Sequence, residues 1–303
     1  MAVSSQIQAG ALTIAERVEI AHVAVGDSLT AAGIRHLFIK GPVVSRQFPR
    51  AADGIRHVSS DVDVWVDPLT ERAVMRALVA DGWETPHLHW LPSLADHAVV
   101  LTHDLWGLTV DVHRTFPGVG VAPIVAFEFL WARRSCLLLA NRPVPVPARS
   151  EHCLLLMLHA LRSPVDSKTQ IIADRALAEL GDGETGDLQR AVQTLGAGPA
   201  LNVRSEFWGT WGSGWDEMWA LRSGQRSGAA MWMMRLKAAR SWRERLTLAI
   251  SALVPRPRGQ DRWRTGDRLR ALPAHWARGA SQLPAAVRQL RAARQPRHQD
   301  EKG

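Results

Sequence analysis

Two aspartates alternate with valine in the segment DVDVWV, residues 61–66. Strict alternation predicts a β-strand, in which side chains two positions apart lie on the same face. Asp61 and Asp63 therefore project together from one face of this strand. Two carboxylates this close repel each other unless a cation lies between them, and carboxylate oxygens are ligands that suit Mg²⁺ or Mn²⁺. A strand with a solvated outer face would show the same spacing, so the segment alone leaves both interpretations open.

A second alternating segment, LTVDVH at residues 108–113, places Asp111 and His113 on one face. If this strand lies beside residues 61–66, its carboxylate joins the first two, and three carboxylates can hold two divalent ions about 4 Å apart, bridged by a triphosphate. This arrangement predicts phosphoryl or nucleotidyl transfer, with Asp111 close to the incoming nucleophile. His113 would contact a phosphate, orient a metal ligand or form a structural hydrogen bond.

Lys40 is one of only four lysines in a chain with 33 arginines, and it stands immediately before Gly41. The apolar run at residues 34–39 predicts a strand, and a proline after Gly41 fits the first position of a short helix. Glycine lets backbone N–H groups approach an anion, and lysine is a compact, mobile charge suited to phosphate. We therefore expect Lys40 and Gly41 to hold the triphosphate of an NTP, with further hydrogen bonds from Ser60. An ordinary solvated lysine at a strand end is the alternative.

The surrounding pattern predicts the elements that position these residues. The first 145 residues indicate a mixed α/β domain around a small sheet. Its expected elements are a helix at 11–32 capped by Gly33, strands at 34–39, 61–66, 98–102 and 105–112, and a helix from Asp67-Pro68 to Ala80. After the proline-rich residues 144–150, helices are expected at 151–161 and 169–180, so that residues 146–253 form a second, helical domain.

The last fifty residues, 254–303, carry the whole charge excess of the chain, with twelve Lys/Arg against four Asp/Glu. We expect short helices and linker there, and a basic tail that contacts nucleic acid or another anionic partner; a solvated end is the alternative. The tryptophans at 208, 211, 215 and 219 would share one helical face, but glycines at 209, 212 and 214 disfavour a helix. These indoles would stack on bases, hold a partner or, more commonly, pack in a core.

The composition also constrains the compartment. Cys136 and Cys153 have neither disulfide-framework nor zinc-site spacing, which fits a reducing, cytoplasmic setting. No uncharged apolar stretch reaches the roughly 18 residues needed to cross a bilayer, and the first thirty residues lack the basic start of a signal peptide. We therefore expect no transmembrane segment.

Taken in order, these segments resemble the uncharacterised nucleotidyltransferases of the DNA-polymerase-β-like superfamily, over about residues 30–180. The motifs that carry the resemblance are Phe38-Ile39-Lys40-Gly41, Arg56 and Ser60 before Asp61 and Asp63, His97, Asp111 with His113, Glu151 with His159, and Asp174. The resemblance implies a minimal nucleotidyltransferase fold and a metal-dependent site for an NTP such as ATP, with Arg56 among the nucleotide-binding residues. Three details depart from the usual pattern: Lys40-Gly41 replaces Gly-Ser, Arg56 lies one residue farther from Asp61, and His113 is followed by arginine instead of tryptophan.

The sequence thus predicts an α+β protein that transfers a nucleoside monophosphate from an NTP to a hydroxyl or phosphate acceptor on RNA, protein or a small molecule. The predicted metal ligands and catalytic residues are Asp61, Asp63 and Asp111. A sugar-nucleotide glycosyltransferase is disfavoured, because only sixty residues precede Asp61. The remaining alternative is a non-catalytic module of the same fold that contacts nucleic acid or a protein through its tryptophans and basic tail.

Overall fold

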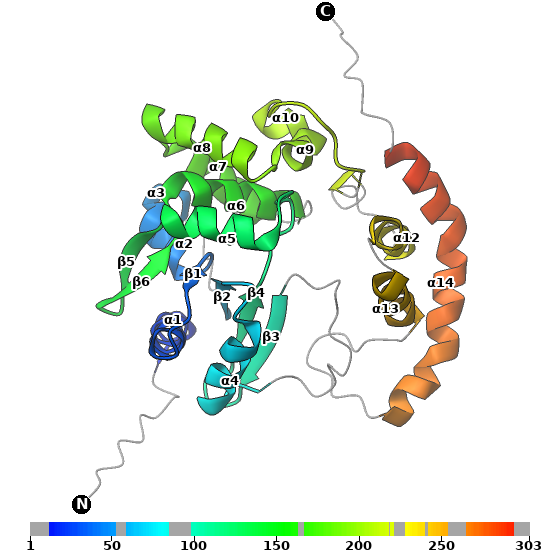
Figure 1. Ribbon diagram of the computed structural model, residues 1–303, viewed down its shortest axis with the longest axis horizontal. Coiled ribbons are helices and arrows are strands. Elements are labelled where there is room, and N and C mark those ends of the chain that lie inside the picture. Colours follow the sequence, from blue (N-terminus) through cyan, green and yellow to red (C-terminus); the bar gives the residue numbers. More distant parts are fainter. Residues whose placement is uncertain are drawn as a thin grey trace, which may run out of the picture.

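The computed structural model describes residues 12–52, 59–84, 98–162, 167–217, 219–220, 228–239, 242–253 and 265–293. Within these ranges, helices cover both faces of a small mixed sheet, and further helices follow it in the chain (Figure 1). The predicted α+β class is therefore confirmed.

The sheet consists of β1 (His36–Phe38), β2 (Asp61–Val66), β3 (Ala98–His103) and β4 (Leu108–His113), in the order β1-β2-β4-β3. β2 and β4 are parallel neighbours, whereas β1 and β3 pair antiparallel with them. The alternating segment at 61–66 is a strand over its whole predicted length. The strand predicted at 105–112 begins later, at Leu108, because a turn containing Gly107 with φ +60° precedes it.

One face of β2 is entirely apolar. Val62, Val64 and Val66 of β2 are fully buried there, together with valines of β4, against α1 (Ile14–Ala31) and α4 (Glu71–Ala80). The alternation of the sequence has thus placed every valine of β2 on the core side.

The start of α4 differs from the prediction. Asp67 was expected to cap a helix that begins at Pro68, but α4 begins at Glu71. The Asp67 side chain accepts a hydrogen bond from the backbone N–H of Leu69, and the Thr70 hydroxyl donates to the Asp67 carbonyl. Asp67 therefore forms a local turn, and the helix starts three residues later than predicted.

The opposite face packs against helices from later in the chain. Leu37, Ile39 and Trp65 lie in a buried cluster with α5 (Pro123–Ala132) and α6 (Arg149–Arg162). The same cluster continues into α7 (Ser167–Ala178) and α8 (Asp182–Thr194). Buried residues from both sides of position 145 therefore share one core, and α6 lies over the face from which the aspartates project.

A hairpin of β5 (Ser135–Leu139) and β6 (Arg142–Val146) precedes α6, and it was not predicted. Ala140 and Asn141 form its turn with φ of 43° and 60°. Pro143 and Pro145 of β6 obscured the strand pattern, because proline lacks an N–H and usually marks a break. An edge strand tolerates proline at alternate positions, because the N–H groups of those residues would point away from the partner strand.

Short helices connect these layers: α2 (Pro42–Gln47), α3 (Pro49–Ala52), α9 (Gly198–Leu201), the 3₁₀ turn Asn202–Arg204 and α10 (Ser205–Trp208). The tryptophan-rich segment is not a continuous helix, since α10 ends at Trp208 and Gly209, Gly212 and Gly214 have positive φ. Trp219 is buried in the core, and the tryptophans at 208, 211 and 215 pack against it. Core packing therefore accounts for these indoles.

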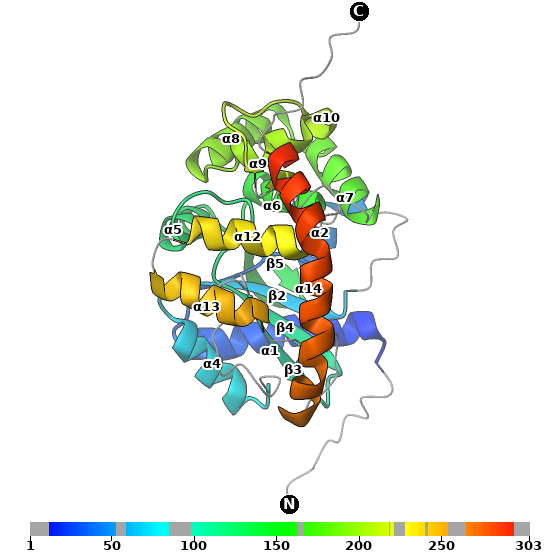
Figure 2. The same cartoon turned by 90° about the vertical axis from the view of Figure 1, so that its right-hand side faces the viewer.

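Three helices complete the described chain: α12 (Gly228–Ala238), α13 (Trp242–Leu253) and α14 (Thr265–Ala293). α14 lies across α12 and α13 (Figure 2), with Ala286 in a small buried cluster beside Ala230 and Met234. The prediction of short helices was wrong for 265–293, which form one helix of 29 residues despite two internal prolines. Within the described ranges, no helix combines the length and apolar character that a bilayer crossing requires.

Candidate metal and nucleotide site

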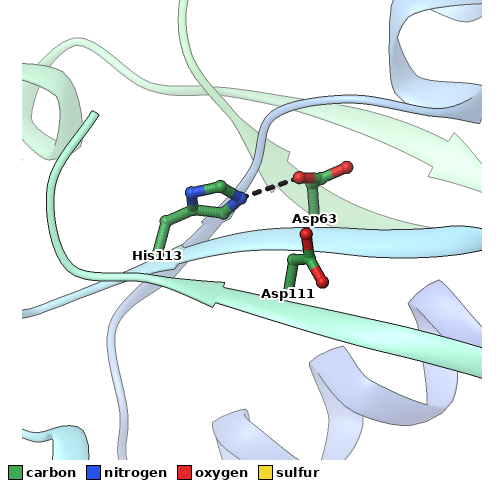
Figure 3. A group of neighbouring side chains, drawn as sticks. All are labelled: Asp63, Asp111 and His113. Atoms are coloured by element: carbon green, nitrogen blue, oxygen red, sulfur yellow. Dashed lines mark hydrogen bonds and ion pairs between the residues drawn. The ribbon is translucent and has the colours of Figure 1, made fainter. Parts of the chain in front are cut away.

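The parallel pairing of β2 and β4 brings the predicted acidic residues together. Asp63 lies directly opposite Asp111 in the ladder, and Asp61 lies opposite Thr109. Figure 3 shows the Asp63 and Asp111 carboxylates beside the imidazole of His113. One potential ligand atom from each of these three side chains lies within 4.8 Å of the other two. The adjacency of the strands, on which the whole metal-site hypothesis depends, is as the sequence predicts.

Asp63 is the most enclosed member of this group, with 2% of its side chain exposed. Its Oδ1 atom accepts a hydrogen bond from Lys40 Nζ at 2.5 Å and another from His113 Nε2 at 2.7 Å. Burial alone would raise the pKa of Asp63, but the hydrogen bond from His113 and the positive charge of Lys40 outweigh it, so the pKa lies well below its ordinary value. Asp63 is therefore a carboxylate that stays ionised.

Asp111 has the opposite environment. Burial, followed by the negative charge of Asp63, raises the pKa of Asp111 to about 6. Two neighbouring carboxylates whose pKa values are pushed apart are typical of sites that handle protons or cations. A divalent cation between them would favour the ionised form of both.

Asp61 projects from the same face but does not belong to the compact group of Asp63, Asp111 and His113 found among the described residues. It is partly exposed, and its carboxylate accepts a hydrogen bond from the Ser59 hydroxyl. Ser60, expected to contact the triphosphate, is exposed beside it. The structure thus places Asp61 at the solvent side of the row and Asp63 at its buried side.

The Lys40-Gly41 corner lies next to this row because β1 runs antiparallel to β2. The Ile39 N–H donates to the Asp63 carbonyl at 3.2 Å, so the following lysine lies over the Asp63 side chain. Gly41 has φ +69°, and a Cβ at this position would lie 3.3 Å from His22 and 3.6 Å from Ser59. The corner is therefore packed between α1 and the segment that leads into β2.

A histidine that the sequence did not single out fixes this corner from α6. The His152 ring is fully buried; its Nε2 donates to the Ile39 carbonyl at 2.9 Å, and its Nδ1 faces the Gln47 side chain. Gln47 in turn donates to the Pro147 carbonyl at 2.9 Å. Burial lowers the pKa of His152 to about 4. A single histidine in an apolar helix forms no motif with other residues, so the sequence could not predict its hydrogen bond to the Ile39 carbonyl.

The last turn of α6 reaches the carboxylates as well. Burial, and then the charge of Lys40, lowers the pKa of His159 to about 4, and its Nδ1 has no hydrogen-bond partner within the described part of the chain. The charge of Arg162 also acts on Asp111 and on His113. A helix from the predicted second domain therefore borders the site, and the charge of its Arg162 acts on two of the grouped side chains.

The resemblance names four further residues, and the structure describes two of them. Arg56 and His97 fall outside the described residues. Glu151 forms an ion pair with Arg133, and Asp174 accepts a hydrogen bond from Trp208 Nε1 at 2.7 Å. Glu151 and Asp174 thus have structural partners in the helical layer.

Residues 3–182 match the family described as "Uncharacterised nucleotidyltransferase". The chain belongs to this nucleotidyltransferase family. The match spans more than half of the chain and includes both aspartate-bearing strands, the Lys40-Gly41 corner and α6, so the resemblance to the uncharacterised nucleotidyltransferases is confirmed.

Two solved structures are similar to this nucleotidyltransferase, and each alignment covers 59% of the present chain. One is a solution structure of the antibiotic-resistance factor ANT(2'')-Ia, with 13% identity, 91% of that chain covered and a TM-score of 0.40. The other is a crystal structure of the lincosamide antibiotic adenylyltransferase LnuA with lincomycin bound, with 16% identity, 95% of that chain covered and a TM-score of 0.32. No curated protein sequence matches the chain.

Proposed function

We propose that this protein is a metal-dependent nucleotidyltransferase that moves a nucleoside monophosphate from an NTP to a hydroxyl or phosphate acceptor and releases pyrophosphate. The observation that carries the proposal is the parallel register of β2 and β4, which sets Asp63 directly opposite Asp111 with Asp61 on the same face. Membership of the nucleotidyltransferase family supports the same reaction.

The donor set fits Mg²⁺ or Mn²⁺. Asp63 and Asp111 offer the hard oxygen ligands that these ions prefer, and Asp61 lies on the same face of β2. Asp61, Asp63 and Asp111 would hold the metal, which when bound supplies charge neutralisation for the phosphates. Zinc sites, by contrast, favour cysteine and histidine ligands, and the described residues place no cysteine here.

The chain's own groups have separate tasks. Lys40, Gly41 and Ser60 bind the triphosphate, and Arg56 adds a further cation to the nucleotide. His113 keeps the Asp63 carboxylate oriented through its hydrogen bond. Asp111, on the neighbouring strand, would accept the proton of the attacking hydroxyl. The row of acids between two strands therefore positions both reacting groups, which is the main demand of phosphoryl chemistry.

Transfer of label from α-labelled NTPs tests this function. The wild type, with Mg²⁺ or Mn²⁺ and a cell extract, should move label into RNA, protein or a small-molecule fraction, and the Asp63→Ala variant should not. Asp67→Asn is a matched control, because Asp67 follows the same strand but pairs with Arg35 at 2.6 Å, at the other end of β2. Equal labelling by the wild type and Asp63→Ala, or none together with no NTP binding, contradicts the proposal.

A further inference from the structure

The Lys40–Asp63 ion pair occupies one oxygen of a carboxylate that the proposed function assigns to a metal. Lys40 Nζ lies 2.5 Å from Asp63 Oδ1, and His113 Nε2 lies 2.7 Å from the same oxygen. A carboxylate has about four lone-pair sites on its two oxygens, so two donors use the capacity of Oδ1. A cation that binds Oδ1 must therefore replace one of them, and a cation that binds Oδ2 would still lie close to the ammonium of Lys40.

Lys40 is the donor that can leave. The His113 side chain is 1% exposed and is held on a central strand, whereas 18% of the Lys40 side chain is exposed and its stem is flexible. Mg²⁺ binds its oxygen ligands at about 2.1 Å, so an ammonium group beside the same oxygen would face a divalent charge at close range. With Asp63 enclosed, little water is present to weaken that repulsion.

We propose that Lys40 is an exchangeable counterion: it neutralises Asp63 until this carboxylate ligates a divalent cation, and it then moves to the triphosphate. The proposal rests on the proposed function and adds an order to it, in which metal binding releases the group that binds the nucleotide. Gly41 follows Lys40 directly, so the displaced ammonium stays at the corner expected to hold the phosphates.

Residue type supports this exchange. Arginine is the cation almost everywhere else in this chain, yet its planar fork would hold a carboxylate through two parallel bonds and would resist displacement. Lysine forms a single-point contact and can pivot on four methylene groups. A lysine at position 40 is thus suited to bind the Asp63 carboxylate and also to release it.

Amine labelling of the folded protein tests the exchange, because the chain has only four lysines. Lys168 and Lys237 are exposed and serve as internal references. Addition of Mg²⁺ alone should raise the acylation rate of Lys40 roughly tenfold, as expected for loss of one charge-assisted hydrogen bond, and a non-hydrolysable NTP should lower it again. In Asp63→Asn, Lys40 should react fast in every condition. Asp67→Asn should respond like the wild type.

Mn²⁺ binding, measured from the electron paramagnetic resonance of the free ion, gives a second readout that needs no acceptor. Without nucleotide, Lys40→Met should bind Mn²⁺ roughly tenfold more tightly than the wild type, because a competing charge is gone, while Lys40→Arg should bind it no more tightly. Circular dichroism checks that both variants are folded.

The outcomes separate this inference from the proposed function. If Mn²⁺ binds in an Asp63-dependent manner but Lys40 stays protected from acylation, Lys40 remains on Asp63 and only the exchange is overturned. If Lys40→Met and the wild type bind Mn²⁺ equally, the exchange is overturned in the same way. If the wild type binds neither Mn²⁺ nor Mg²⁺, the metal-dependent function fails and the exchange fails with it.

Discussion

Substitution of Gly41 by alanine should impair both folding and nucleotide binding. The backbone of Gly41 has φ +69° and ψ −137°, a region that is nearly restricted to glycine, and placing another residue there costs about 1–3 kcal/mol. The new Cβ would also lie 3.3 Å from Cε1 and 3.4 Å from Nε2 of His22. His22 has no room to yield, since it is fully buried and its Nδ1 bonds the Val18 carbonyl at 2.8 Å.

Gly33 provides the matched control. It has nearly the same φ, +68°, but no atom lies within 4 Å of the position of an added Cβ. Gly33→Ala should therefore lower the free energy of unfolding by only about 1 kcal/mol, which is the cost of a left-handed backbone for alanine. Gly41→Ala should lose about 2–3 kcal/mol, because the backbone cost and the contact with His22 combine.

Urea unfolding at pH 7 measures both losses, and titration with a fluorescent NTP analogue in the folded range measures binding. We expect Gly41→Ala to weaken nucleotide binding roughly tenfold, equivalent to about 1.4 kcal/mol, and Gly33→Ala to leave it unchanged. Equal losses of stability in the two variants would refute the crowding at His22. Normal nucleotide affinity in folded Gly41→Ala would refute the role of the corner in binding phosphate.

Two further predictions concern the packing around the site. The pKa of His152 is about 4 in the folded protein against about 6.5 unfolded, so the unfolded chain binds more protons between these values, and stability should fall by about 3 kcal/mol from this residue as the pH drops from about 6.5 to about 4. Urea unfolding across this range should show a shallower pH dependence in His152→Gln than in the wild type; an identical dependence would contradict the lowered pKa of His152. Arg149 bonds the side chain of Glu184 and the Glu179 carbonyl at 3.0 Å, so Arg149→Met should cost about 2–3 kcal/mol in thermal or urea unfolding. The exposed Arg190 is the control, where the same change should cost under about 1 kcal/mol, and a similar loss in both would show that Arg149 contributes no more than a surface charge.

The acidic strands were predictable because their signal is local. A period of two fixes which side chains share a face, so Asp61, Asp63 and Asp111 could be assigned to one side of the sheet from sequence alone. The valines between them are all buried on the other side, as that period requires. What the period does not contain is register, and a slip of β4 by one residue would have turned Asp111 into the apolar core.

Residues whose role depends on tertiary contacts gave no such signal. His152 lies in an apolar run that reads as helix, and nothing in its neighbours indicates that its ring reaches the Ile39 carbonyl. The β5–β6 hairpin was missed for a different reason, since Pro143 and Pro145 obscured its alternation. Local pattern thus predicted which residues bear the charge, and the fold alone showed which side chains hold them in place.

The position of α6 ties the two halves of the chain into a single site. Its buried side completes the core over Trp65, while His152 bonds the backbone beside Lys40 and the last turn brings His159 and Arg162 toward the carboxylates. A helix that packs on the same sheet face from which the aspartates project must border them, because that face is only four strands wide. For the transfer proposed above, we expect the acceptor to enter between the partly exposed Asp61 end of the aspartate row and this helix. We then expect α6 to take part in recognising the acceptor.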